Sequence, residues 1–130
     1  MKYEMEIKEL TRAEEEVMQI LWKLRKGFIK DILEKFDEPK PAYSTVSTII
    51  RILTEKGFVN YRAYGRTYQY FPLISKDDYR KSRISSFVKD YFSNSYQKMV
   101  SFFAREDSLS VKDMEEIMEM MKKEEEEKQP

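Results

Sequence analysis

The stretch Ala42 to Pro72, AYSTVSTIIRILTEKGFVNYRAYGRTYQYFP, decides the fold of this chain. Its first part has helical spacing over about residues 43–56, and Gly57 supplies a C-terminal stop. Two runs rich in Val, Tyr, Thr and Phe follow at residues 58–63 and 67–72, on either side of a glycine-containing turn. A short helix followed by such a hairpin is the order of a winged helix-turn-helix. In that arrangement the helix enters the DNA major groove and the hairpin lies against the backbone.

Two helical patterns precede this stretch, and the second of them is short. In the first, Thr11 and Glu14 form a capping-box pattern, and apolar residues recur with helical spacing until Gly27 ends the helix. The second pattern consists of Ile29, Ile32, Leu33 and Phe36. The prolines of the segment DEPKP, residues 37–41, then require a loop. The order up to Pro72 is therefore three helices and a hairpin.

Three further helical patterns follow Pro72. Ser75 with Asp78 predicts the start of the first, and a break is expected at Asn94 or Ser95. Arg105 to Leu109 reads as a loop, and Ser110 with Asp113 predicts the start of the last helix. The predicted fold is mainly α with a small β-hairpin. It comprises a winged-helix domain at 1–74, a helical dimerisation domain at 75–123 and a disordered acidic tail at 124–130.

The C-terminal helices carry a broad apolar face but contain too few residues to enclose it alone. These helices could fold back onto the first domain, or they could pack against a second copy of the chain. We favour the second copy, because methionine-rich surfaces suit adaptable interfaces. The residues predicted to form the dimer interface are Ile84, Phe87, Val88, Tyr91, Met99, Phe103, Ile117 and Met118.

The composition argues against an enzyme. The chain contains no cysteine and no histidine, which removes disulfides, thiolate nucleophiles, imidazole bases and soft metal sites. The acidic clusters at 14–16 and 124–127 are typical of a helix start and of a solvated chain end. We therefore predict no catalytic residue, no metal and no cofactor. The charged N-terminus and the lack of a long apolar run predict a cytoplasmic protein without membrane insertion.

The net charge of zero hides a basic segment, because residues 40–74 contain five basic residues and only one acid, Glu55. Hydroxyl groups and arginines at this place can contact phosphates and base edges. Any one of them could be part of a solvated helix face, and Ser44 could be an N-cap. Together they predict binding to double-stranded DNA. The predicted DNA-binding residues are Ser44, Thr45, Ser47, Thr48, Arg51, Arg62, Tyr64 and Arg66. The alternative is a winged-helix protein-interaction module, whose docking face would expose aliphatic residues instead.

Four segments carry a resemblance to a known family: LTRAEEEVMQILW from Leu10, STVSTIIRILTEKGFV from Ser44, GRTYQYFPL from Gly65 and VSFFAREDSLSVKDMEEI from Val100. In this order they resemble the penicillinase-repressor (BlaI/MecI) family over residues 6–123. The resemblance implies a homodimeric transcriptional repressor that binds a dyad operator.

The resemblance also implies a mode of inactivation, in which a membrane sensor-protease system leads to cleavage in the C-terminal domain. The cleaved bond falls at Phe102-Phe103, where typical members have Asn-Phe. Hydroxyl residues here replace several basic residues of the family's reading positions, so the operator sequence does not carry over. Copper-responsive relatives use a C-terminal cysteine pair, and the absence of cysteine excludes thiolate metal sensing by this chain.

Overall fold

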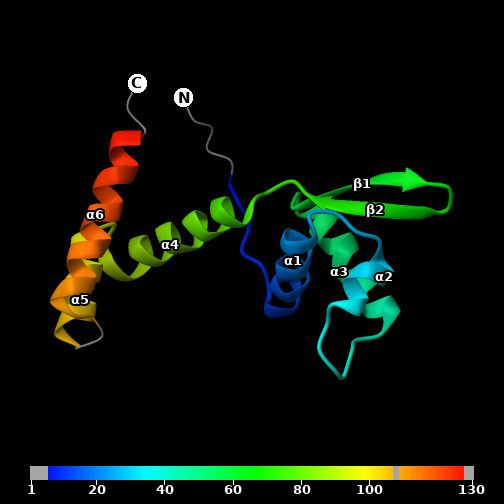
Figure 1. The fold of residues 1–130 in the computed structure, drawn as a ribbon, viewed down its shortest axis with the longest axis horizontal. Helices are drawn as coiled ribbons and strands as arrows, with labels where there is room; N and C mark the ends of the chain where they lie inside the picture. The colour runs from blue at the N-terminus through cyan, green and yellow to red at the C-terminus, as the bar shows by residue number, and fades with distance from the viewer. Residues whose placement is uncertain (1–5, 107–108, 128–130) are drawn as a thin grey trace. The chain divides into compact units, whose positions relative to one another are not determined.

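The structure, a computed structural model, describes residues 6–106 and 109–127. Its described part confirms a mainly helical fold with one β-hairpin (Figure 1). The elements are α1 (Arg12–Leu24), α2 (Ile29–Glu34), α3 (Tyr43–Glu55), β1 (Val59–Tyr64), β2 (Thr67–Pro72), α4 (Lys76–Phe92), α5 (Tyr96–Arg105) and α6 (Val111–Glu127). The chain forms two compact units, one up to Arg83 and the other from Ile84 onward.

Helix α1 begins as its sequence predicts and ends differently. The capping box is present: the Glu14 N–H donates to Thr11 Oγ1 at 3.2 Å, and the Thr11 N–H donates to Glu14 Oε1 at 3.0 Å. The helix ends at Leu24, and its C-cap Arg25 has a positive φ of 73°, so the expected stop at Gly27 was wrong. Gly27 instead exchanges two backbone hydrogen bonds with Tyr70 of β2, at 2.9 and 2.8 Å. The first three helices are thereby tied to the hairpin by backbone pairing.

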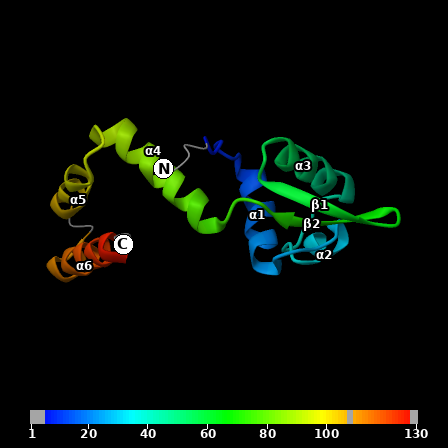
Figure 2. The ribbon, with the colours of Figure 1, turned by 90° about the horizontal axis from the view of Figure 1, so that it is seen from above.

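The core of the first unit lies between α1, α2, α3 and the base of the hairpin. The spacing of apolar residues in each helix directs one stripe inward, which confirms the helical patterns read from the sequence. Figure 2 shows α3 on the β1 side of the hairpin and α2 on the β2 side. The most deeply buried side chains are Val17, Met18, Leu21, Ile32, Val46, Ile50, Leu53, Phe58 and Val59.

The hairpin has a tighter turn than predicted. Tyr64 pairs with Thr67 in the antiparallel register, so only Gly65 and Arg66 lie outside the strands. Gly65 has a φ of +62°, a conformation that a side chain disfavours, and this explains the glycine at the turn. Figure 1 shows the hairpin extending beyond the three helices of this unit. The expected alternation of side chains along β1 is confirmed by the register, with Val59 inward and Arg62 outward.

Helix α4 begins inside the first unit. Ser75 caps it by accepting a hydrogen bond from the Asp78 N–H at 3.0 Å. One turn on, the buried Tyr79 packs edge-on against Phe58, and its hydroxyl accepts from the Leu10 N–H and donates to Glu15, each at 3.1 Å. These contacts group the first turns of α4 with the winged helix. The domain boundary expected at residue 74 stays a prediction.

The second unit contains the end of α4 and the helices α5 and α6. Ser93 and Asn94 have positive φ values of 50° and 66° and interrupt the helix where a break was predicted. Ser95 then caps α5, and Ser110 and Asp113 cap α6 reciprocally. Helix α6 includes residues 124–127 of the predicted acidic tail, and residues 128–130 of that tail lie outside the described residues.

Candidate nucleic-acid interface

The outward face of α3 is polar. Val46, Ile50 and Leu53 point into the core, and this places Ser44, Thr48 and Arg51 at the centre of the opposite, exposed side. Thr45 lies exposed on one flank, and the partly buried Ser47 lies on the flank nearer the hairpin; Ser44, Thr45 and Thr48 line a shallow depression of about 300 Å³. The structure therefore brings the five predicted residues of this helix onto one surface.

Arg51 is held only loosely on this surface. Its guanidinium lies 3.5 Å from the Glu55 carboxylate one turn on, and both side chains are 65% exposed. An exposed pair of this kind contributes little stability, so a phosphate or a guanine edge could replace Glu55 at small cost.

Ser44 is not the N-cap of α3, which was the alternative considered for it. Ala42 is the N-cap and cannot donate or accept through its side chain, so Ser44 lies within the first turn of the helix. No side chain caps this end of α3 in the described structure. Among the described residues, the N–H groups of Thr45 and Val46 donate to the Ala42 carbonyl, and those of Tyr43 and Ser44 remain open to an external acceptor.

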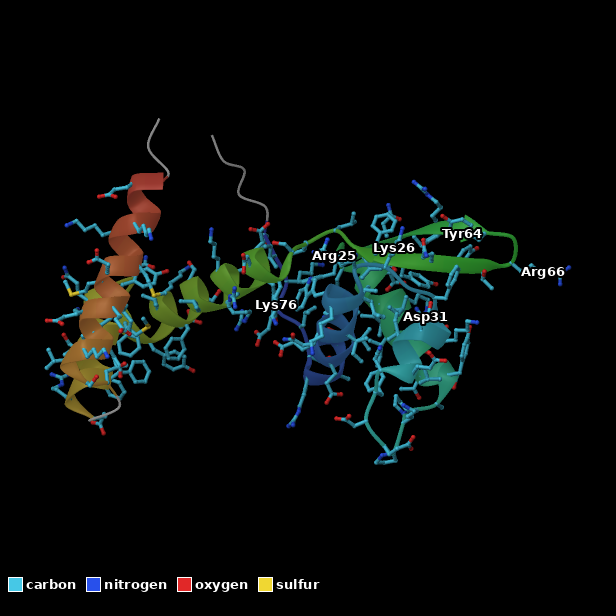
Figure 3. The ribbon with its side chains drawn as sticks, in the orientation of Figure 1. Arg25, Lys26, Asp31, Tyr64, Arg66 and Lys76 are labelled. Carbon is cyan, nitrogen blue, oxygen red and sulfur yellow. The ribbon has the colours of Figure 1, made fainter. Side chains whose placement is uncertain are left out.

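The predicted hairpin residues do not all lie on one surface. Arg62 and Tyr64 share the strand face opposite Val59, and hence opposite the core, whereas Arg66 lies in the turn. Figure 3 shows Arg66 at the far end of the hairpin with its side chain pointing away from the helices. Tyr64 packs edge-on against Phe28 at a centroid distance of 6.0 Å. Of these three hairpin residues, Arg66 also lines the open space between the hairpin and α3.

Between the hairpin and the starts of α2 and α3 lies an open groove of about 640 Å³, which we call the tyrosine groove. Its lining includes Lys30, Tyr43, Ser47, Arg66, Tyr68 and Tyr70. Sequence reasoning missed Lys30 and the three tyrosines. The alternation of β2 could have placed Tyr68 and Tyr70 together on the inward face, but the proximity of Tyr43 and Lys30 requires the tertiary structure.

The other end of α3 is anchored by an ion pair with α1. Lys56, the C-cap residue, donates from Nζ to Glu14 Oε1 at 2.6 Å, and the two side chains are 23% and 7% exposed. Burial alone would raise the pKa of Glu14, but the hydrogen bond and positive charge of Lys56, with the Thr11 N–H, bring that pKa below its ordinary value. This contact fixes α3 against α1 and so orients the exposed helix face.

A helix pair, a third helix with an exposed hydroxyl and arginine face, and a hairpin with an arginine at its tip define a winged helix-turn-helix protein of the DNA-binding class. Comparison with known proteins agrees with this class. The family model described as penicillinase repressor matches residues 10–123. This chain therefore belongs to the penicillinase repressor family, as its sequence resemblance predicted.

Individual relatives are similar over most of their length. The methicillin resistance regulatory protein MecI of Staphylococcus aureus (strain N315) is 26% identical over 116 residues, covering 88% of this chain and 94% of that protein. The penicillinase repressor of Bacillus licheniformis is also 26% identical, covering 88% and 91%. The solution structure of the DNA-binding domain of the repressor BlaI matches with a TM-score of 0.50 and 28% identity, covering 56% of this chain and 90% of that domain. Within the described residues, no helix is long and apolar enough to cross a bilayer.

Proposed function

We propose that this chain is a homodimeric transcriptional repressor of the cytoplasm that binds a two-fold symmetric DNA operator through α3 and the hairpin tip. The observations that carry this proposal are the exposed face of α3 with Ser44, Thr48 and Arg51 and the position of Arg66 at the tip of the hairpin. The family membership and the relatives named as repressors support it.

In this proposal the α3 face reads the major groove. Arg51 leaves Glu55 and contacts a guanine edge or a phosphate, while Ser and Thr hydroxyls contact base edges or phosphates. The methyl groups of Thr45 and Thr48 suit contact with thymine methyl groups. Arg66 neutralises a flanking phosphate from the hairpin tip. The outward-facing Arg62 and Tyr64 then approach DNA only where it curves around the hairpin.

The second unit supports a homodimer. Several of its large apolar side chains are exposed in the single chain, including Tyr91 at 73% and Met118 at 64%. Exposed apolar surface of this extent marks an interaction site. Ile84 and Phe87 are also exposed, whereas Val88 is buried within the single chain and belongs to the interior of its own unit. Pairing two copies would also match the two halves of a symmetric operator.

We further propose that repression is relieved by proteolysis at Phe102-Phe103, through a membrane sensor-protease system. This bond lies within α5, and Phe102 is 42% exposed. A protease requires an extended backbone, so α5 must open locally before cleavage. The short length of α5 and its lack of fully buried residues favour such opening.

A footprint on the DNA upstream of its own gene tests the operator proposal. We expect protection of a symmetric site, with binding that weakens as salt rises. Arg51→Ala with Arg66→Ala should weaken binding and reduce the salt slope by about 1 for Arg66, and by about 1 more if Arg51 contacts a phosphate and not a guanine edge. Arg105→Ala with Lys112→Ala, exposed cations of the second unit, form the matched control and should leave binding unchanged. Salt-independent binding, or equal binding by the α3 variant, would favour a protein-interaction module instead.

A further inference from the structure

A second open groove lies on the first unit, where the last turn of α1, the end of β2 and the start of α4 meet, and we call it the tryptophan groove. Its volume is about 440 Å³, within the range of roughly 300–1,000 Å³ that is typical of small-molecule sites. Its lining includes Trp22, Lys23, Arg25, Pro72, Leu73 and Lys76. None of these six residues belongs to α3 or to the hairpin tip, so the proposed DNA contacts give this groove no role.

One part of the lining is apolar and firmly held. Trp22 donates from its indole nitrogen Nε1 to the Ile74 carbonyl at 2.9 Å, and its ring lies 6.1 Å from that of the buried Tyr79. The Leu73 N–H donates to the Phe58 carbonyl at 2.7 Å, yet the Leu73 residue is 56% exposed. A single exposed leucine is ordinary, but this one shares a groove with an indole ring. Together they offer a surface on which an aromatic ring can pack.

The remainder of the lining carries positive charge. Lys23, Arg25 and Lys76 border the groove, and no carboxylate is among its described lining residues. Within the described part of the chain, none of these three cations forms an ion pair. Asp77, the acid next to Lys76, is paired with Arg80 instead. The groove therefore combines an apolar surface with cations that are available to an anion.

Two of these cations occupy positions that the local backbone disfavours. Arg25 follows the end of α1 with a φ of 73°, a conformation that glycine adopts without strain. Lys76 is the first residue of α4, at the positive end of the helix dipole, where negative charge is the stabilising choice. Figure 3 labels both side chains, one after α1 and one at the start of α4. Local preferences that are violated at two residues of one groove indicate a functional site.

We propose that the tryptophan groove binds a small aromatic carboxylate. The carboxylate oxygens accept charge-assisted hydrogen bonds from Arg25 and Lys76, and the aromatic ring packs on Trp22 and Leu73. Such a ligand joins the end of α1 to the start of α4, so it stabilises the folded first unit. This inference is independent of the proposed DNA binding by α3.

The test uses the full-length chain, which contains its own reporter because Trp22 is its single tryptophan. Benzoate and phenylacetate are each titrated beside their neutral amides, and acetate tests the charge without the ring. Binding is measured by calorimetry and by the emission of Trp22. We expect an aromatic acid to bind with a Kd of about 1 mM or below and to change the emission. Its amide and acetate should bind about tenfold more weakly or worse, because each lacks one of the two kinds of contact.

Three single variants locate the ligand. Arg25→Gly removes a cation and relieves the positive φ, so it should weaken binding about tenfold without lowering the midpoint of urea unfolding. Lys76→Gln should weaken binding to a similar extent. Lys26→Gln is the matched control, because Lys26 is an exposed cation next to Arg25 that does not line the groove, and binding should be unchanged.

The proposal stands if an aromatic acid binds, changes the emission of Trp22 and loses affinity in Arg25→Gly but not in Lys26→Gln. It is overturned if neither acid binds up to about 10 mM, or if the neutral amide binds as tightly as its acid. Equal binding by Arg25→Gly and the unaltered chain also overturns it, because the ligand then lies outside the groove. Urea unfolding shows whether Arg25→Gly is folded, and Lys76→Gln carries the same test if it is not.

Discussion

The ion pair between Lys56 and Glu14 offers the sharpest test of how α3 is held. The perturbation is Lys56→Met, which keeps the aliphatic stem and removes the ammonium group. Glu14 then keeps its Thr11 N–H donor at 3.0 Å but loses the ammonium at 2.6 Å, with its carboxylate only 7% exposed. An uncompensated charge at this depth is costly. We expect Lys56→Met to lower the free energy of unfolding by about 2–3 kcal/mol, less than for a fully buried pair because Lys56 is 23% exposed.

A double-mutant cycle isolates the pair. Glu14→Gln retains an acceptor for the Thr11 N–H, so we expect a loss of about 1 kcal/mol. The double variant carries no stranded charge, and it should lose less than the two single variants together. The resulting coupling energy is about 1–2 kcal/mol. Urea unfolding followed by the emission of Trp22, the chain's single tryptophan, reports on the unit that contains the pair.

The pH dependence supplies an independent check. The pKa of Glu14 lies below 4.5 in the folded chain, so the pair contributes fully above pH 4.5 and is lost as the pH falls through the lower folded value. We expect the coupling at pH 7 to vanish in strong acid. A coupling below about 0.5 kcal/mol at pH 7, as exposed pairs give, would refute the assignment of a shielded pair.

Three further predictions concern other contacts. Tyr79→Phe should cost about 1–3 kcal/mol in urea unfolding, because it strands the buried Leu10 N–H. Burial raises the pKa of Tyr79 above 10.0, so its contribution to the free energy of unfolding is full below pH 10 and is lost as the pH rises through the folded value. If the free energy of unfolding of the variant depended on alkaline pH in the same way as that of the unaltered chain, this assignment would be contradicted. Gly65→Ala should cost about 1 kcal/mol of unfolding free energy through its φ of +62° alone, because no atom lies within 4 Å of the added Cβ, and a neutral result would refute strain at the turn. Ser95→Ala should reduce the helix content measured by circular dichroism and accelerate limited proteolysis in α5, at a cost of about 1 kcal/mol, whereas unchanged proteolysis would show that the cap is dispensable.

Local patterns predicted the elements well where the deciding interaction is close in sequence. The Thr11 and Glu14 capping box involves residues one turn apart, and the apolar stripe of α3 follows from helical geometry alone. The end of α1 was missed for a non-local reason. Gly27 looks like a helix stop, but its backbone pairs with Tyr70 of the hairpin, and the helix ends earlier, at Leu24 with Arg25 as its C-cap.

The candidate site, too, was predicted where local spacing decides it and missed where contacts between distant residues decide it. Helical periodicity was enough to place Ser44, Thr48 and Arg51 on one exposed face. Strand alternation separated Arg62 from Tyr61, but it could not tell which of the two faces the helices. Only the packing of Val59 into the core decides that, and it turns the tyrosines toward α3.

By itself the sequence determined the order of helices and hairpin, the caps, the polar face of α3 and the family to which the chain belongs. These properties depend on residue spacing and on the preferences of single residues. Tertiary structure alone decided that Tyr79 of α4 completes the first core, that Lys56 holds Glu14, and that Lys30 and Tyr43 meet the hairpin tyrosines. Such contacts join residues far apart in the chain, and their partners are selected by the packing of whole elements, which no local pattern encodes.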